Sequence, residues 1–139
     1  MEHLGIYGIW SNPQGRVVLI RKARGPYVGL LDLPGGSPEP GESPEETLRR
    51  ELVEECGVRV AAVRSWHAFD LRVSRDSAGR PIDFRHKGQI AVLDVADKHF
   101  AVHDVEDVAA VEEHDLAGLS AAECSAPLWE ARALIDLLL

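Results

Sequence analysis

Three glutamates in the segment RRELVEECGV (49–58) stand at spacings that could bring their carboxylates together: Glu51, Glu54 and Glu55. If this segment is helical, they project from one arc about 100° wide, because they occupy positions i, i+3 and i+4. Like charges at these spacings repel one another and destabilise the helix slightly. A hard divalent cation such as Mg²⁺ would relieve the repulsion, since it takes oxygen ligands. The chemistry that this spacing indicates is metal binding.

The same segment has a second interpretation that needs no function. Glu45 and Arg49, and likewise Glu46 and Arg50, are spaced four residues apart in the favourable order, and Arg50 also reaches Glu54. Exposed pairs of this kind stabilise a solvated helix. A salt-bridged surface helix is therefore the alternative to a metal site.

The turn before this segment favours the metal site. Gly35 and Gly36 follow Pro34 and lead into a loop that ends at Glu42. Glycine lets the main chain approach a ligand closely, so a carbonyl oxygen of this turn could face the carboxylates. Glycine carbonyls opposite three glutamates would form an oxygen-rich cradle for a divalent cation.

The element that must position the glutamates is a helix over residues 44–56. Ser43 is a good N-cap, Pro44 suits the first helical position and Glu46 completes a capping box. Gly57 stands where a helix commonly ends. Three residues form an apolar stripe that should face the core: Leu48, Leu52 and Cys56.

The remaining pattern predicts a sandwich of helices and a mixed sheet in a single domain over residues 1–139. Strands are expected at 4–10, 16–22, 58–73, 87–96, 99–103 and 107–111, with 58–73 forming either one long strand or two strands with a bend. The first two strands should form a hairpin, and residues 74–81 a turn. A loop with a short extended piece at 31–33 precedes the main helix, a short helix is expected at 114–119, and an amphipathic helix at 126–139.

Composition excludes several function classes. A net charge of −8 disfavours binding to the nucleic-acid backbone or to an anionic membrane. No apolar stretch reaches 18 residues, and the first residues carry no pattern of a signal peptide, so a cytoplasmic location is expected. The two cysteines are far apart in sequence and are expected to be reduced thiols.

One motif joins the glycine turn to the glutamates. Gly36, five residues, Glu42, seven residues and then RELVEECGV fit the pattern G-x5-E-x7-R-E-U-x-E-E-x-G-U, where U is a bulky aliphatic residue. Every specified position is filled. The chain therefore resembles the Nudix hydrolase family, with a Nudix box at 36–58, and the preceding LDLPGG also resembles the usual lead-in to the box.

The resemblance implies an α/β fold, an α/β/α sandwich with a mixed β-sheet, in which the box forms a loop, a helix and a loop. It also implies hydrolysis of a nucleoside diphosphate linked to another group, with Mg²⁺ or Mn²⁺ as cofactor. The implied metal ligands are Glu51, Glu54, Glu55 and the carbonyl of Gly35. Either Glu54 or Glu55 would be the general base. The remaining two implied catalytic residues would act together, with Arg50 orienting Glu42 and the glutamate cluster.

Four residues outside the box are further candidates. Asp104 or Glu106, in the loop before the last strand, would supply another metal ligand; a solvated loop is the alternative. Arg21 and Lys22 end the second strand, near where members of the family contact a phosphate. Their alternative is a strand end that meets solvent.

Aromatic residues and histidines give weaker signals. Trp10, Trp66 and Phe69 could stack on a nucleobase, but aromatic residues in strands more often belong to the core. Trp129 is expected to pack its helix, and the histidines have no metal-ligand spacing, so they are expected to be structural or exposed.

The expected substrate is a small-molecule nucleotide, and a homodimer is compatible with the sequence. Residues 70–76 lack the proline common in ADP-ribose pyrophosphatases, and the coenzyme A motif is missing, so the chain looks most like the MutT-like group. That group converts nucleoside triphosphates to monophosphates and pyrophosphate. Cleavage of ADP-ribose, a nucleotide sugar or a dinucleoside polyphosphate is the alternative within the enzyme class. A nucleotide-sensing domain without catalysis is the alternative outside it, and the intact glutamates favour the enzyme.

Overall fold

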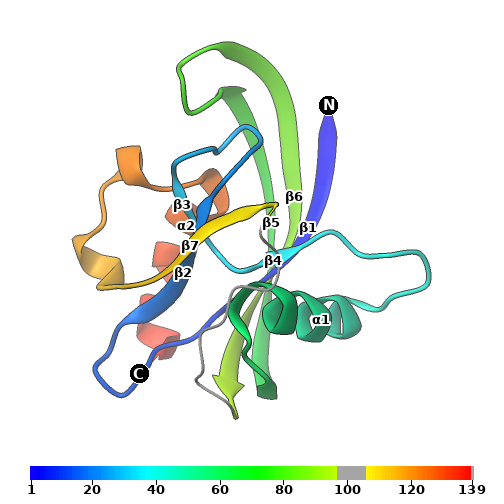
Figure 1. Cartoon of the computed structure of the whole chain (residues 1–139), viewed down its shortest axis with the longest axis vertical. Coiled ribbons are helices and arrows are strands. Elements are labelled where there is room, and N and C mark those ends of the chain that lie inside the picture. Colours follow the sequence, from blue (N-terminus) through cyan, green and yellow to red (C-terminus); the bar gives the residue numbers. More distant parts are fainter. Residues whose placement is uncertain (97–105, 139) are drawn as a thin grey trace.

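The computed structural model describes residues 1–96 and 106–138 (Figure 1). The strands are β1 (Glu2–Ile9), β2 (Val17–Lys22), β3 (Leu31–Asp32), β4 (Gly35–Gly36), β5 (Val60–Arg75), β6 (Pro81–Val95) and β7 (Val108–His114). The helices are α1 (Pro44–Cys56), α2 (Ala126–Ala131) and three 3₁₀ segments, η1 (Leu116–Gly118), η2 (Ala121–Glu123) and η3 (Arg132–Leu138). No helix in the described ranges is long and apolar enough to cross a membrane.

The strands form two sheets. One has the order β4-β1-β6-β5, with β1 and β6 parallel and the other pairs antiparallel. The second is antiparallel, with the order β3-β2-β7. Helix α1 and the α2 region lie on opposite sides of these sheets, each with its own apolar core (Figure 1). The expected mixed α/β fold with a mixed sheet is confirmed.

The expected hairpin of the first two strands is wrong. β1 pairs along its whole length with β6, whereas β2 lies between β3 and β7 in the other sheet. The last five residues of β1 and the first four of β2 are all buried, without alternation. Strands that are covered on both faces show this continuous apolar pattern. The same pattern in the sequence is also compatible with a hairpin, so it does not identify the partner strand.

Helix α1 agrees with its predicted bounds, and its caps explain why. The Ser43 hydroxyl accepts a hydrogen bond from the Glu46 amide at 3.2 Å, and the Glu46 carboxylate accepts one from the Ser43 amide at 3.1 Å. Gly57 adopts a left-handed conformation with φ of 64°. The predicted apolar stripe, which contains Leu48 and Leu52, is fully buried in the core beneath the helix.

Other elements differ from their predicted bounds. β5 and β6 form one long hairpin, and β6 begins at Pro81 instead of at the predicted residue 87. The turn is short because the Asp76 carboxylate accepts hydrogen bonds from the Ala78 and Arg80 amides. The expected helix over 126–139 is α-helical only as far as Ala131 and continues as η3. The expected helix at 114–119 is the short 3₁₀ segment η1, and the expected strand at 99–103 lies outside the described residues.

Candidate functional site

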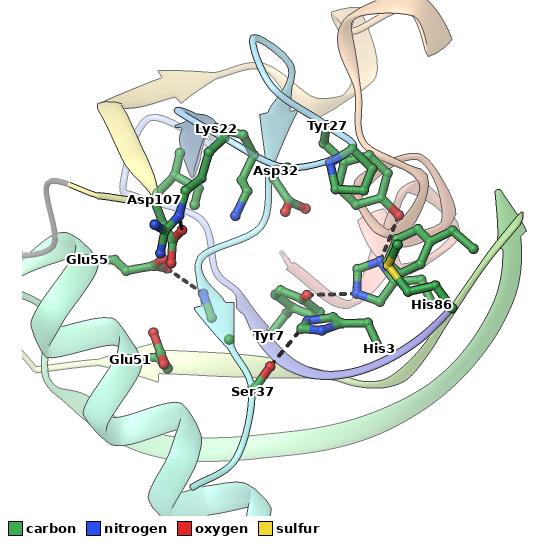
Figure 2. A pocket seen from close by; sticks show the side chains of 18 of the residues that line it. His3, Tyr7, Lys22, Tyr27, Asp32, Ser37, Glu51, Glu55, His86 and Asp107 are labelled. Carbon is green, nitrogen blue, oxygen red and sulfur yellow. Dashed lines mark hydrogen bonds and ion pairs between the residues drawn. The ribbon is translucent and has the colours of Figure 1, made fainter. Parts of the chain in front are cut away.

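A pocket of about 500 Å³ opens between α1, the strand ends and the loop after β2 (Figure 2). Its two ends differ in chemistry. An acidic wall is formed by Glu51 and Glu55 of α1 together with the turn at β4. An aromatic wall faces it across the cavity (Figure 2) and contains Tyr7, Tyr27 and His86. Phe84 lies against the His86 ring and completes this wall. Lys22 and Asp32 lie between the two walls (Figure 2).

The glycines of β4 allow the acidic wall to form. Gly35 has φ of 149°, and a Cβ atom there would lie 2.1 Å from the Ile6 carbonyl oxygen. A Cβ atom at Gly36 would lie 2.6 Å from the carboxyl carbon of Glu51. Any side chain at either position would therefore push β4 away from β1 or displace the Glu51 carboxylate.

Glu55 is the most deeply buried carboxylate of the acidic wall. Its residue is 2% exposed, and its Oε1 accepts a hydrogen bond from the Gly35 amide at 2.8 Å. Burial raises the pKa of Glu55 to about 9, and the nearby Glu51 charge also raises it, whereas the Gly35 amide and Lys22 act in the opposite direction. A carboxyl group in this setting holds a proton or needs a cation beside it.

Arg50 ties the loop before α1 to the helix. Its guanidinium donates two hydrogen bonds to the Glu42 carboxylate, at 2.7 and 2.9 Å, and these lower the pKa of Glu42 to about 2. It also donates to Glu51 at 2.8 Å and to Glu54 at 3.3 Å. One cation thus holds three carboxylates in fixed positions.

The three box glutamates do not all face the pocket. Glu51 and Glu55 line it, whereas the Glu54 side chain is 44% exposed, pairs with Arg50 and is not among the lining residues. Within residues 1–96 and 106–138, no three His, Cys, Asp or Glu side chains are grouped closely enough to hold a metal ion. The donor set at the acidic wall, two carboxylates beside a glycine main chain, nevertheless fits a hard cation such as Mg²⁺ or Mn²⁺.

The acidic candidates outside the box are not among the described residues that line the pocket. Asp104 lies outside the described residues, and Glu106 is exposed, 3.4 Å from an Arg24 nitrogen. Its neighbour Asp107 lines the pocket and also pairs with Arg24. The sequence places Asp107 in the same acidic loop as the two favoured candidates, and nothing in the loop distinguishes one acidic residue from the next.

Of the two basic candidates at the end of β2, Lys22 lines the pocket and Arg21 does not. Arg21 donates to Glu112 at 2.6 and 3.0 Å and to the Gly29 carbonyl at 2.9 Å. These contacts hold Arg21 outside the pocket that Lys22 lines.

The aromatic wall was missed from the sequence. His86 is 1% exposed, with Nε2 2.8 Å from the Tyr7 hydroxyl and Nδ1 2.7 Å from the Tyr27 hydroxyl. Burial lowers the pKa of His86 to about 3, so the ring is neutral. Of the three aromatic residues considered for stacking, Trp10 and Trp66 pack in or against the core beneath α1, and the buried Phe69 lies against the rings of Tyr7 and His86.

Comparisons with known proteins agree with this architecture. Nucleoside triphosphatase NudI of Enterobacter sp. is 48% identical over 60 residues, which are 40% of this chain and 42% of that protein. The 8-oxo-dGTP diphosphatase of Haemophilus influenzae is 40% identical over 65 residues, 46% of this chain and 48% of that protein. The chain thus spans less than half the length of either relative.

A solved structure matches over nearly the whole fold. The MutT NUDIX hydrolase from Burkholderia pseudomallei superimposes with a TM-score of 0.73 at 21% identity, covering 96% of this chain and 97% of that one. A family model, the NUDIX domain, matches residues 1–132, which include the box, both sheets and the acidic wall. The chain therefore belongs to the NUDIX family.

Proposed function

We propose that this chain is a metal-dependent pyrophosphohydrolase that converts a nucleoside or deoxynucleoside triphosphate to the monophosphate and pyrophosphate. The observation that carries the proposal is that Glu51, Glu55 and Lys22 face one pocket. The aromatic wall on the far side of that pocket is largely buried and gives that end an apolar lining, which is compatible with a nucleobase. Two relatives are named for activities of the same kind, a nucleoside triphosphatase and a diphosphatase.

The acidic wall is the proposed metal site. Mg²⁺ or Mn²⁺ would be held by Glu51, Glu55 and the Gly35 carbonyl. Further ligands would be Glu54 and one acidic residue before β7, either Asp104 or Glu106. When bound, such a cation neutralises phosphate charge and lowers the pKa of a bound water. Arg50 keeps the carboxylates in place, and burial of Glu55 makes its ionised form dependent on a cation.

The hydrolytic step needs a base and a positive charge from the chain. A water oxygen attacks one of the two phosphorus atoms that the cleaved bridge joins, and the bridging oxygen leaves with the bonding electron pair. Glu54 or Glu55 accepts the water proton. Lys22 lines the pocket, whereas Arg21 is held by Glu112, so Lys22 is the favoured candidate for contacting a phosphate.

A substrate panel tests the proposal. The purified protein is incubated with ribo- and deoxynucleoside triphosphates, ADP-ribose, a nucleotide sugar and a dinucleoside polyphosphate, and released monophosphate and pyrophosphate are measured with Mg²⁺, Mn²⁺ or a chelator. We expect turnover of triphosphates that stops with the chelator. Cleavage of ADP-ribose or a dinucleoside polyphosphate without any triphosphate turnover would overturn the substrate assignment. Binding without turnover of any compound would indicate a sensor.

A further inference from the structure

His3 lines the pocket at the start of β1, between the two walls. The parallel pairing of β1 with β6 places it opposite His86, and the two rings meet edge to face with their centroids 5.1 Å apart. Its Nε2 lies 3.4 Å from the hydroxyl oxygen of Ser37, the residue that follows the glycines of β4. Figure 2 shows His3 between Ser37 and His86, so its ring connects the glycine turn of the acidic wall with the aromatic wall.

The second ring nitrogen of His3, Nδ1, is open to a ligand. It makes no hydrogen bond within residues 1–96 and 106–138. No buried side-chain nitrogen or oxygen in these ranges lacks a hydrogen-bond partner, so Nδ1 must reach accessible space. His86, the other histidine that lines the pocket, is 1% exposed, and both of its nitrogens are bonded to tyrosine hydroxyls. Of the two histidines, His3 is therefore the one that can contact a ligand.

The pocket has more carboxylates than cationic side chains. Its described lining contains six Asp or Glu residues and three Lys or Arg residues. Two of the three cations are already paired, Arg24 with Glu106 and Asp107, and Arg50 with the carboxylates of the box. A polyanionic substrate would therefore meet an excess of negative charge. A divalent cation would offset part of this excess, and a lining group that becomes positive would offset more of it.

His3 can change its charge in the neutral pH range. Burial lowers the pKa of His3, Lys22 on the other side of the cavity also lowers it, and Asp107 acts in the opposite direction. Without a ligand the ring is therefore mostly neutral at pH 7, whereas a phosphate group beside it would favour the protonated form. The other ionisable residues on the elements around His3 that line the pocket are Glu2 of β1, His86 of β6 and Glu39 of the loop after β4.

We infer that His3 binds a phosphate group of the substrate through Nδ1–H and takes up a proton as the phosphate binds. The inference rests on the proposed function and adds a second phosphate contact to that of Lys22, which Figure 2 shows on the opposite side of the cavity. A protonated imidazole donates from both nitrogens, so Ser37 can accept from Nε2 while the phosphate accepts from Nδ1. The acidic pocket thus gains a positive charge only when an anion is bound.

An NMR titration of the histidine rings tests the inference without any hydrolysis. The probe is methylenediphosphonate, a non-hydrolysable analogue of pyrophosphate, added together with Mg²⁺; Mg²⁺ alone and Mg²⁺ with sulfate are the references. We expect the diphosphonate to raise the pKa of His3 by at least about 1, because the nearby negative charge favours the protonated ring. An unchanged or lower pKa of His3 in the presence of saturating diphosphonate, or no binding of the diphosphonate, would overturn the inference.

The variant His3→Gln sharpens the test, because it removes the charge and keeps a side-chain amide that can bond to Ser37. Its affinity for the diphosphonate should be about tenfold weaker than that of the wild type at pH 6, and much closer to it at pH 8, where the wild-type ring also loses its proton. An unchanged affinity at pH 6, or an equal loss at both pH values, in the folded variant would overturn the inference.

His67→Gln is the matched control. His67 is likewise a half-buried histidine beside a serine, with its Nε2 2.8 Å from the Ser65 hydroxyl oxygen, but it does not belong to the described lining of the pocket. Its replacement should leave the affinity for the diphosphonate and the pKa of His3 unchanged. A loss of affinity as large as that of His3→Gln would show that the effect is not specific to His3 and would overturn the inference.

The two levels of the account can fail separately. If the diphosphonate raises the pKa of His3 but no triphosphate is hydrolysed, the proposed reaction is wrong and the role of His3 is retained. If triphosphates are hydrolysed, but the pKa of His3 does not respond to the diphosphonate and His3→Gln has the wild-type KM at pH 6, the reaction is retained and the role of His3 is wrong.

Discussion

The two walls of the pocket are built in different ways. The acidic wall comes from one continuous stretch, in which Gly35, Arg50, Glu51 and Glu55 lie in a turn and the helix that follows it. The aromatic wall is assembled from β1, the loop after β2 and β6, and the hydroxyl of Tyr7 meets a residue 79 positions away. The wall proposed for catalysis is thus local in sequence, and the wall proposed for recognition depends on the complete fold.

The walls also treat ionisable groups differently. In the acidic wall, burial raises the pKa of Glu55 to about 9, while Arg50 lowers that of Glu42 to about 2, so neighbouring carboxylates differ widely in proton affinity. In the aromatic wall, burial lowers the pKa of His86 to about 3 and removes its charge. If the proposed function holds, charge is concentrated where phosphate would bind and excluded where the base would lie.

The largest expected effect is at the acidic wall. Glu55→Gln or Glu54→Gln should lower kcat at least about 100-fold, because each removes a metal ligand or the base. Stability should be nearly unchanged, because burial raises the pKa of Glu55 to about 9 and so keeps it protonated without a cation, and because Glu54 makes only a half-exposed ion pair with Arg50. Steady-state kinetics and thermal unfolding in chelator measure both, with Glu45→Gln, an exposed carboxylate of the same helix, as the control. A large loss of stability with nearly full activity would favour the salt-bridged surface helix.

Arg50→Ala should affect activity and stability together. It leaves Glu42, Glu51 and Glu54 without their shared cation, and we expect a loss of about 1–3 kcal/mol in the free energy of unfolding. Arg50→Lys should recover only part of both quantities, because an ammonium group cannot make the two parallel bonds to Glu42. Denaturant unfolding and kcat/KM provide the measurements. A variant that is as stable as the wild type would contradict the role assigned to Arg50.

Lys22, between the walls, should act on substrate binding. Lys22→Ala should raise KM for triphosphates about tenfold, and less for a diphosphate-linked sugar, because the triphosphate carries more negative charge. Arg21→Ala is the control from the same strand end, since Arg21 is held by Glu112, and its effect on KM should be smaller. A larger increase in KM for Arg21→Ala than for Lys22→Ala would indicate that Arg21, and not Lys22, contacts the phosphate.

The smallest effect concerns the pH dependence of the aromatic wall. In the unfolded chain His86 has its ordinary pKa near 6.5, whereas in the folded chain the pKa is about 3. The unfolded state therefore gains a proton first as the pH falls below 6.5, and the folded state loses up to about 1.4 kcal/mol of stability per pH unit. Unfolding between pH 7 and 5 should show this slope in the wild type and a smaller slope in His86→Phe. If the wild type and His86→Phe showed the same slope, His86 would not be buried as a neutral ring in the folded protein.

Local signals in the sequence were sufficient for α1 and its site. Ser43, Glu46 and Gly57 fix the ends of the helix through contacts only a few residues long, so its bounds could be predicted. The partners of β1 could not be, because a continuous apolar strand fits either a hairpin or a central position in a sheet. His86 appeared structural for the same reason, since only the parallel pairing of β1 with β6 places it opposite His3 and beside the pocket.

The central claim, that the acidic wall holds a divalent cation, is tested most directly by Mn²⁺ binding measured with electron paramagnetic resonance. The wild type should bind Mn²⁺, and Mg²⁺ should displace it. Glu51→Gln and Glu55→Gln should weaken binding at least about tenfold, whereas Glu45→Gln should not. Equal Mn²⁺ affinity in the wild type and both acidic-wall variants, or no binding to the wild type, would contradict the account.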